Sequence, residues 1–397
     1  MHERDYYVIL VDYTANPPAK VFADEHIQES TLDQDKVYEI AKEHNATLVI
    51  SACVDQANIS ACYAMEKLGL YCPFSFDTIC KITNKGNMKQ TMLDNQIPTS
   101  RFVYCEKGVI PDSNFGLNFP VIVKPADGNS SNGVKVAYDK KDMIEYLHEA
   151  QKISRTGKTI VEEFVSGTEV SAYCIVSDKT AHIVMCVQRS VVFKGEEKIP
   201  ICFAASAPAN ISEAAMSKLE SAASDIARAY CLDNTPLLVQ AIITDDEVSV
   251  FEFAPRVGGG ASYKAILLST GYDIISATID SYLGKQISTQ YQEVRDKCTT
   301  IIMHTTSCVF DHFENEDDLI YEGLIEGLYL YKSKGAIMDD SVASKGKIGS
   351  FITKAKTQDE LKKKLSKVFD RLEAHDTEGK SVLKREYLQL FLDALSE

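Results

Sequence analysis

LLVQAIITDDEVSVFEFAPRVGGG, residues 237–260, contains two apolar runs separated by a short acidic turn. The composition and spacing of the runs predict two strands paired as an antiparallel hairpin. A three-residue turn at residues 245–247 would place Gln240 opposite Glu252 on one face of the sheet. Opposed residues have Cβ atoms about 4.5–5.5 Å apart, so these two side chains could share one Mg²⁺. A two-residue turn would instead shift the register by one and separate them.

A cation and three glycines follow this hairpin. Arg256 leaves the second run, where its permanent charge could hold a transferring phosphoryl group. Three backbone N–H groups for an anionic substrate come from Gly258, Gly259 and Gly260. A plain strand-to-helix turn would explain the glycines alone, and an exposed strand carboxylate would explain Glu252 alone. Neither explains why all these features fall in one short segment.

A lysine and a long polar loop occur upstream. Lys124 ends the apolar run VIVK, and the loop at residues 126–133, ADGNSSNG, separates that run from the strand-like VKVAY. Eight polar residues exceed the usual two to five of a hairpin loop. Backbone amides freed by the glycines, together with hydroxyl donors, are typical of anion-binding nests. An ordinary surface loop explains the pattern equally well. The candidate phosphate-binding residues are Lys124, Gly128, Ser130, Ser131 and Gly133.

Acidic residues interrupt the next apolar run, IVEEFVSGTE at residues 160–169. Carboxylates in an apolar strand are costly without partners. Glu162 and Glu163 would be explained by a strand edge that presents backbone groups to an adenine ring. Glu169, beyond the turn, could accept hydrogen bonds from two ribose hydroxyls. A solvated edge strand is the alternative.

The rest of the chain indicates alternating helices and strands. Residues 6–12 and 46–52 are predicted strands, and residues 32–44 and 56–68 predicted helices, which implies a parallel sheet covered by helices. No G-x-G-x-x-G is present, so we expect packing rather than dinucleotide binding. A strand pair is also predicted around the turn at residues 166–168. Further helices are predicted at residues 213–230, 273–283, 359–372 and 381–395.

Composition restricts the class of partner. The chain has 397 residues, 42 basic and 57 acidic side chains and a net charge of −15, which argues against a nucleic-acid surface. Eleven cysteines without C-x-x-C spacing indicate reduced thiols in a cytoplasmic protein. Residues 1–10 lack the apolar run of a secretory signal, and no stretch has the length of a transmembrane helix, so we expect no membrane partner.

In this order, the three clusters resemble the ATP-grasp superfamily of ligases, in particular the group of carbamoyl phosphate synthetase large chains, biotin carboxylases and L-amino-acid ligases. NKGNMKQTMLDNQIPTSRF, residues 84–102, looks like the family's helix with an ATP-phosphate lysine, which maps to Lys85. VIVKPADGNSSNGV looks like the second lysine, Lys124, with the glycine-rich lid. VEEFVSGTE looks like the adenine hinge, which includes Val165, with Glu169 as the ribose acid. The family's two metal-ligand positions match Gln240 and Glu252, and its phosphate-binding position matches Arg256.

The resemblance implies an α/β and α+β protein with the ATP-grasp fold. Residues 1–82 would form a Rossmann-like pre-ATP-grasp domain, residues 83–290 the ATP-grasp core and residues 291–397 a C-terminal α+β lobe. ATP with Mg²⁺, or Mn²⁺ in its place, would activate a small carboxylate, such as an amino acid, as an acyl phosphate. An amine would then displace phosphate to form an amide. Arg189 could add positive charge for the substrate. The resemblance is also compatible with a homodimer.

Two departures from the family pattern matter. The usual E-x-N-P-R reads EFAPR here, so Ala254 replaces an asparagine metal ligand, which puts a second Mg²⁺ in question. The strand at residues 6–12 resembles the family's second strand, so the opening βα unit is expected to be missing. Two alternative functions stay open: a bicarbonate-activating enzyme of the carboxylase or carbamoyl-phosphate type, and an ATP-binding module without catalysis.

Overall fold

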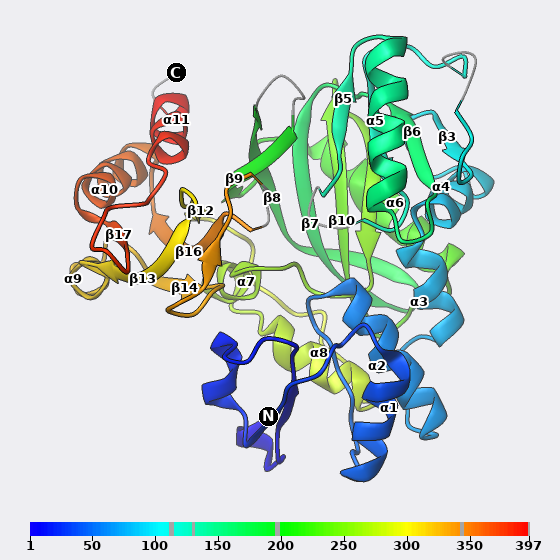
Figure 1. Cartoon of the computed structure of the whole chain (residues 1–397), viewed down its shortest axis with the longest axis horizontal. Helices are drawn as coiled ribbons and strands as arrows, with labels where there is room; N and C mark the ends of the chain where they lie inside the picture. Colours follow the sequence, from blue (N-terminus) through cyan, green and yellow to red (C-terminus); the bar gives the residue numbers. More distant parts are fainter. Residues whose placement is uncertain (111–114, 129–131, 195–198, 342–344, 396–397) are drawn as a thin grey trace.

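Two antiparallel sheets of unequal size dominate the architecture (Figure 1). The computed structural model of the chain describes residues 1–110, 115–128, 132–194, 199–341 and 345–395. In Figure 1 the small sheet lies at the upper right, the C-terminal helices at the left and the N-terminal segment at the bottom. This mixture of layers confirms the predicted α/β and α+β class.

The small sheet has four strands in the order β3-β6-β4-β5. Their bounds are Phe102–Cys105, Thr159–Glu163, Val121–Pro125 and Lys135–Ala137. Helix α5, Lys140–Ile153, buries its apolar side against the sheet, with Met143 and Leu147 in contact with the β4 valines. Asp139 begins α5 because its side chain accepts the Asp142 N–H, as an N-cap does.

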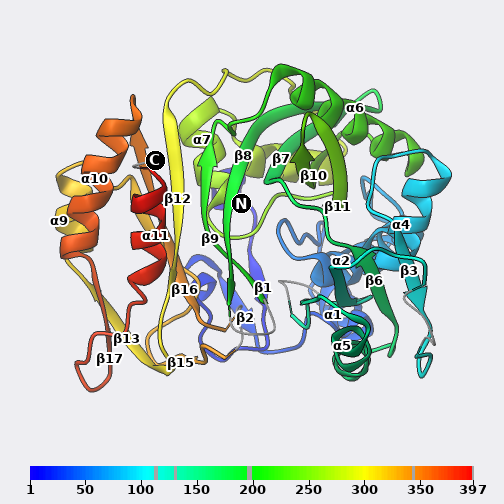
Figure 2. The ribbon, with the colours of Figure 1, turned by 90° about the horizontal axis from the view of Figure 1, so that it is seen from above.

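The large sheet has eight strands in the order β11-β10-β7-β8-β9-β12-β16-β14. Their bounds, in that order, are Glu247–Ala254, Thr235–Thr244, Thr168–Ser177, Thr180–Lys194, Ile199–Ala207, Lys297–His304, Lys347–Ala355 and Gly327–Leu330. Helix α6, Glu213–Ala229, packs on one face. Helices α7, Ser262–Thr270, and α8, Ile274–Tyr282, pack on the other face, against the central strands β7, β8 and β10. In Figure 2, α6 lies at the top of the view, whereas α5, which packs on the small sheet, lies at the bottom.

The strand pair predicted around residues 166–168 is wrong. Strand β6 pairs with β3 and β4, whereas β7 pairs with β10 and β8, so the chain crosses from the small sheet to the large one between them. Gly167 lies in this crossing, where a Cβ atom would come within 2.3 Å of the Ile243 carbonyl oxygen. The crossing therefore passes so close to β10 that only glycine fits without a shift.

The β10–β11 hairpin has the predicted partners but not the predicted turn. Thr244 pairs with Glu247, so the turn contains only Asp245 and Asp246, whose φ angles of 47° and 66° suit a tight hairpin. A β-bulge then shifts the register, and Gln240 faces Glu252 directly. The bulge restores the opposition that a two-residue turn alone would have removed.

The N-terminal segment contains a parallel strand pair, but its second strand is not the predicted one. Strand β1, Ile9–Val11, pairs with β2, Glu25–Ile27, a short polar strand that the apolar pattern could not indicate. Residues 46–52 form no strand, because their backbone bonds elsewhere: Ala52 O accepts the Val257 N–H at 3.1 Å. Short 3₁₀ helices span His2–Arg4 and Pro18–Phe22. The helices that follow are α1 Gln34–Glu43, α2 Asp55–Lys67, α3 Phe76–Thr83 and α4 Lys85–Asp94.

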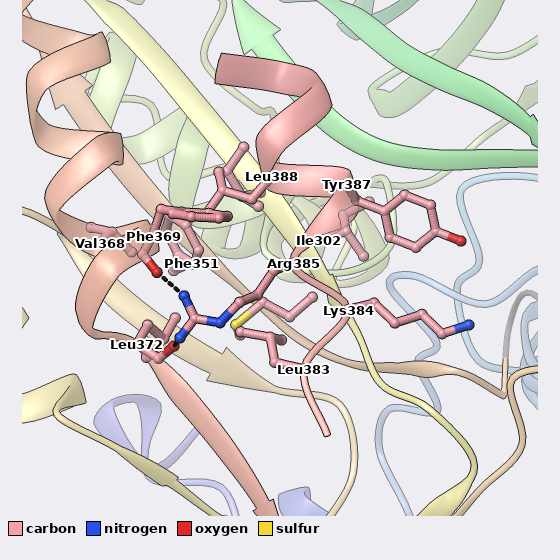
Figure 3. Close-up of a pocket in the computed structure, with 12 residues that line it drawn as sticks. Ile302, Phe351, Val368, Phe369, Leu372, Leu383, Lys384, Arg385, Tyr387 and Leu388 are labelled. Atoms are coloured by element: carbon pink, nitrogen blue, oxygen red, sulfur yellow. Dashed lines mark hydrogen bonds between the residues drawn. The ribbon is translucent and has the colours of Figure 1, made fainter. Parts of the chain in front are cut away.

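The C-terminal lobe adds a three-stranded sheet, ordered β15-β13-β17, beside the end of the large sheet. Its elements are β13 Cys308–Glu314, α9 Glu316–Tyr321, β15 Ile337–Met338, α10 Gln358–Arg371, β17 Glu373–Asp376 and α11 Glu386–Ala394. The Arg385 guanidinium donates to the Phe369 and Leu372 carbonyls at the end of α10 (Figure 3). The cavity drawn there is about 20 Å³, which holds one water molecule rather than a substrate.

No helix in the described ranges is both long and apolar enough to cross a bilayer.

We predict that Gly167→Ala lowers stability, because the new methyl group meets backbone that cannot move aside without disturbing β10. The expected result is a lower midpoint of thermal unfolding than the wild type. Gly259→Ala is the matched control, since its methyl group would meet no atom within 4 Å. Equal midpoints for the two variants would show that the crossing has room for a side chain.

Candidate nucleotide-binding site

A cavity of about 780 Å³ lies between the two sheets and the C-terminal lobe. Volumes of 300–1,000 Å³ are typical of small-molecule sites. Its wall contains residues of β4, β6, β7, β8, β10, β11 and β16. The structure therefore brings together most of the predicted site. Those in the wall are Lys85, Lys124, Gly128, Glu162, Glu163, Val165, Glu169, Arg189, Gln240, Glu252, Arg256, Gly258, Gly259 and Gly260.

Three predicted residues are not placed in that wall. Ser130 and Ser131 lie outside the described residues. Gly133, with φ 72°, is described but does not line the cavity; a Cβ atom there would lie 2.9 Å from Pro125 and Ile153 side-chain atoms. Its conformational freedom therefore shapes the loop rather than offering a binding surface.

One buried carboxylate holds two lysines at the joint between the sheets. Glu162 forms ion pairs with Lys124 and, at 2.7 Å, with Lys89, whose side chain is fully buried. Lys89 also donates to the hydroxyls of Thr99, at 2.6 Å, and Ser100, at 2.9 Å. Ion pairs this deeply buried require nearly complete hydrogen bonding to be tolerated. We refer to Lys89, Glu162 and Lys124 as the lysine triad.

Burial and charge act in opposite directions within the lysine triad. Burial alone would favour protonated Glu162, but Lys124 and Lys89 outweigh it and lower the pKa of Glu162 to about 2. Burial lowers the pKa of Lys89 to about 8, although Glu162 opposes the shift. Glu162 is therefore a carboxylate at neutral pH, and it was predicted as an adenine contact rather than as a lysine partner. Lys89 was missed, although it lies one helical turn after Lys85.

A second ion pair joins helix α4 to the metal-binding candidates. Lys85 Nζ lies 2.8 Å from Glu252 Oε1. Burial opposes the charged form of Lys85, but Glu252 raises its pKa; burial likewise opposes ionised Glu252, but Lys85 lowers its pKa. Gln240 donates from Nε2 to the Ser171 hydroxyl at 3.0 Å, so its amide oxygen is the group left to face a metal.

A third ion pair attaches the predicted phosphate-binding arginine to the N-terminal segment. Arg256 Nε and Nη2 each lie 2.6 Å from an Asp55 carboxylate oxygen, a bidentate arrangement. Burial opposes the charge, but the hydrogen bonds to Asp55 raise the pKa of Arg256. Asp55 is the first residue of α2, and nothing in its local sequence indicates this role.

A fourth pair joins two residues to which we had assigned different ligands. Arg189 Nη1 lies 2.6 Å from Glu169 Oε1, so the predicted substrate cation contacts the predicted ribose acid. Glu163, by contrast, is turned toward Arg101 at 3.1 Å and the Asn118 N–H at 2.8 Å. These bonds tie Glu163 to the loop before β4.

The donor set fits one Mg²⁺ better than two. Glu252 and Gln240 supply oxygen ligands on one face, and water or substrate oxygens complete many Mg²⁺ sites. Ala254 is buried and absent from the cavity wall. The described residues contain no cluster of three or more His, Cys, Asp or Glu side chains suited to a metal.

We predict that Glu162→Gln destabilises the protein more than Lys89→Met. The first change leaves two buried ammonium groups without a carboxylate, which typically costs about 3–5 kcal/mol. The second leaves the Lys124–Glu162 pair intact and puts an apolar chain of similar length in the buried position. Urea unfolding at pH 7 measures both free energies. An equal or larger loss for Lys89→Met would contradict this account of the lysine triad.

Part of the chain that forms the cavity matches a known domain. Residues 117–264 match the family model described as "ATP-grasp domain". Over 90 residues the chain is 34% identical to D-alanine--D-alanine ligase of Pediococcus pentosaceus, which covers 22% of this chain and 24% of that protein. The chain spans about a quarter of the length of the curated relatives that it matches first.

Two solved structures are similar over nearly the whole chain. L-amino acid ligase from Bacillus licheniformis has a TM-score of 0.75 at 17% identity, with 94% of each chain covered. The biotin carboxylase domain of 2-oxoglutarate carboxylase from Hydrogenobacter thermophilus, in complex with MgADP, ADP and bicarbonate, has a TM-score of 0.76 at 12% identity, with 100% of this chain and 90% of that chain covered. At these identities the likeness shows the fold. Together with the match of residues 117–264 to the ATP-grasp domain model, it shows that the chain has the ATP-grasp fold.

Proposed function

We propose that the protein is an ATP-dependent carboxylate–amine ligase that forms an amide through an acyl phosphate, with an amino acid or similar small acid as substrate. The observation that carries this proposal is the set of charged pairs around one cavity. Lys85, Lys124 and Arg256 are each held by a carboxylate in the wall, beside a run of glycines. Such a wall suits a polyphosphate at one end and a carboxylate at the other.

We assign the nucleotide to the joint between the sheets. The crossing from β6 to β7 would contact the adenine ring through the backbone near Val165, and Glu169 would accept from the ribose. Lys85 and Lys124 would neutralise the phosphates. Glu252 and Gln240 would hold Mg²⁺, or Mn²⁺, which also prefers oxygen ligands. A metal held there would offset the negative charge of the phosphates.

In the proposed reaction a carboxylate oxygen of the acid attacks the γ-phosphorus of ATP. The bond from that phosphorus to the β,γ-bridging oxygen breaks, and ADP leaves with the electron pair. The amine nitrogen then attacks the acyl carbon, inorganic phosphate leaves, and the nitrogen loses a proton. Arg256 would hold the transferring phosphoryl group, and the glycine N–H groups the acid. Positioning and charge neutralisation contribute most of the rate in phosphoryl transfer.

Binding of the nucleotide would change the partners of these cations. Lys85 and Arg256 each have a carboxylate partner in the protein as it stands. A phosphate oxygen would take the place of the carboxylate, which frees Glu252 for the metal and Asp55 from the arginine. Until the substrate binds, these ion pairs therefore balance the charge of the buried cations.

Two alternative functions also have specific support. The fold likeness to a biotin carboxylase domain is compatible with bicarbonate as the acid. The buried Ala254 in place of a ligand is compatible with nucleotide binding without turnover. We also propose that the protein works where thiols stay reduced, since Cys72 donates a hydrogen bond to the Cys62 sulfur at 3.4 Å and the two form no disulfide.

We predict ADP release only when an acid substrate is present. The assay offers single amino acids, amino-acid pairs and bicarbonate, with hydroxylamine to trap acyl phosphate as a hydroxamate. A hydroxamate with a particular amino acid would support the ligase and identify its acid. Turnover with bicarbonate alone would move the protein to the carboxylase branch. Nucleotide binding without turnover on any acid would contradict the enzyme assignment.

We predict that Glu252→Gln reduces turnover by about 100-fold or more, because the metal loses its only charged ligand in the pair and Lys85 loses its partner. Glu247→Gln is the matched control, since Glu247 lies on the same strand but is exposed and pairs with Lys218. The measurement is kcat as a function of Mg²⁺ concentration. A similar small effect in both variants would remove Glu252 from the metal site.

A further inference from the structure

One end of the cavity carries two cations beside each other. Arg189 on β8 and Lys347 on β16 both line the wall, and the thiol of Cys202 on β9 lies near both. Arg189 is paired with Glu169. The side chain of Lys347 forms no ion pair or hydrogen bond with any residue of the described ranges, although its backbone pairs with His304 in the ladder between β12 and β16. We refer to Arg189 and Lys347 as the cationic end of the cavity.

Placing these two cations together is unfavourable without an anion. Burial lowers the pKa of Lys347, and the neighbouring Arg189 acts in the same direction, while Cys202 opposes the shift. Glu169 offsets one of the two positive charges, so about one remains. A partly buried cation that faces a cavity and lacks a partner is best accounted for by a ligand that supplies the negative charge.

The glycine run connects the cationic end to the proposed reaction centre. A Cβ atom on Gly258 would meet the Tyr173 ring at 2.6 Å, and one on Gly260 would meet the Tyr331 hydroxyl at 2.5 Å. The Tyr331 N–H donates to the carbonyl of Ile348, the residue after Lys347, at 2.9 Å. The same run begins two residues after Arg256. A substrate on these glycines therefore lies with Arg256 on one side and Lys347 on the other.

Arg256 and Lys347 reach the cavity from different elements and have different neighbours. Arg256 follows β11, the first strand of the large sheet, and Lys347 begins β16, six strand positions away. Arg256 is also held by Asp55, whereas Lys347 lies near Arg189 and Cys202. We therefore assign the activated carboxylate to Arg256 and a different anionic group to Lys347.

We propose that Lys347 and Arg189 bind a second anionic group, a carboxylate or phosphate, carried by one of the two substrates of the proposed ligase. The inference rests on the proposed function and names the substrate class of the same site. The group belongs either to the acid, which then has two anionic groups, or to the amine acceptor, as in an amino acid. Cys202 and Tyr331 line the space between the two cations and the glycines.

The test compares Lys347→Met with Lys347→Arg and Lys345→Met. The first removes the charge but keeps the apolar length, and the second keeps the charge. Lys345 is exposed and reaches only Asp339 at 3.8 Å, so its variant controls for loss of a nearby lysine. ADP release is measured with L-alanine against L-aspartate as the acid, and with glycine against glycinamide as the amine. Lys347→Met is expected to raise KM about tenfold or more for the substrate that carries the second anion.

Each arm gives a distinct result. A raised KM for the dicarboxylate with hydroxylamine as acceptor assigns the anion to the acid. A raised KM for glycine but not glycinamide assigns it to the amine. In both cases kcat should change little and Lys347→Arg should restore most of the KM. Equal KM values for anionic and neutral substrates in Lys347→Met and wild type would overturn the proposal.

Binding separates failure of this inference from failure of the proposed function. If no acid supports turnover, the wild type and Lys347→Met are titrated with succinate and with inorganic phosphate by calorimetry. Weaker binding of either probe to the variant supports an anion site at the cationic end. Identical binding, or none to the wild type, removes Lys347 from any anion site whatever the reaction is.

Discussion

The structure depends on one carboxylate shared by two buried lysines. Glu162 lies on β6 of the small sheet, Lys124 on the neighbouring β4 and Lys89 on α4, so the lysine triad ties three elements at the floor of the cavity. Thr99, which accepts from Lys89, donates to the carbonyl of Val250 on β11 at 2.6 Å. The same network therefore reaches the large sheet. Because buried charges without partners are so costly, this constraint fixes how the two sheets meet.

Other buried cations in the cavity wall also have carboxylate partners, but a bound ligand could replace these partners. Lys85 holds Glu252, and Arg256 holds Asp55, each across elements far apart in the chain. These pairs lie where a polyphosphate and a metal would supply the opposite charges. The lysine triad is closed by hydroxyls as well as by charge, so we expect it to persist when a nucleotide binds, while the more open pairs rearrange. Lys347 differs from all of them, since its side chain forms no ion pair with any residue that the structure describes.

Much of the site was predictable from the sequence because it lies in short segments with strong local patterns. The hairpin with Gln240 and Glu252 was correctly paired, although its bulge, which local composition does not indicate, compensates for a shorter turn than expected. The role of Asp55 was not predictable, since it depends on a contact across the fold, and neither was the place of Lys347 in the cavity wall, which depends on how β16 joins the large sheet. The prediction of a strand at residues 46–52 is wrong for the same reason. The backbone of this apolar run hydrogen-bonds to helix and loop residues rather than to a neighbouring strand.

The most direct test of this account is a crystal structure with Mg²⁺ and a non-hydrolysable ATP analogue. The account predicts the analogue between the two sheets, Glu252 on the metal instead of Lys85, and Lys85 on a phosphate oxygen. The ion pairs of Glu162 with Lys89 and Lys124 should remain in place. An analogue bound elsewhere, or bound in the cavity with the Lys85–Glu252 pair unchanged and no metal on Glu252, would contradict it.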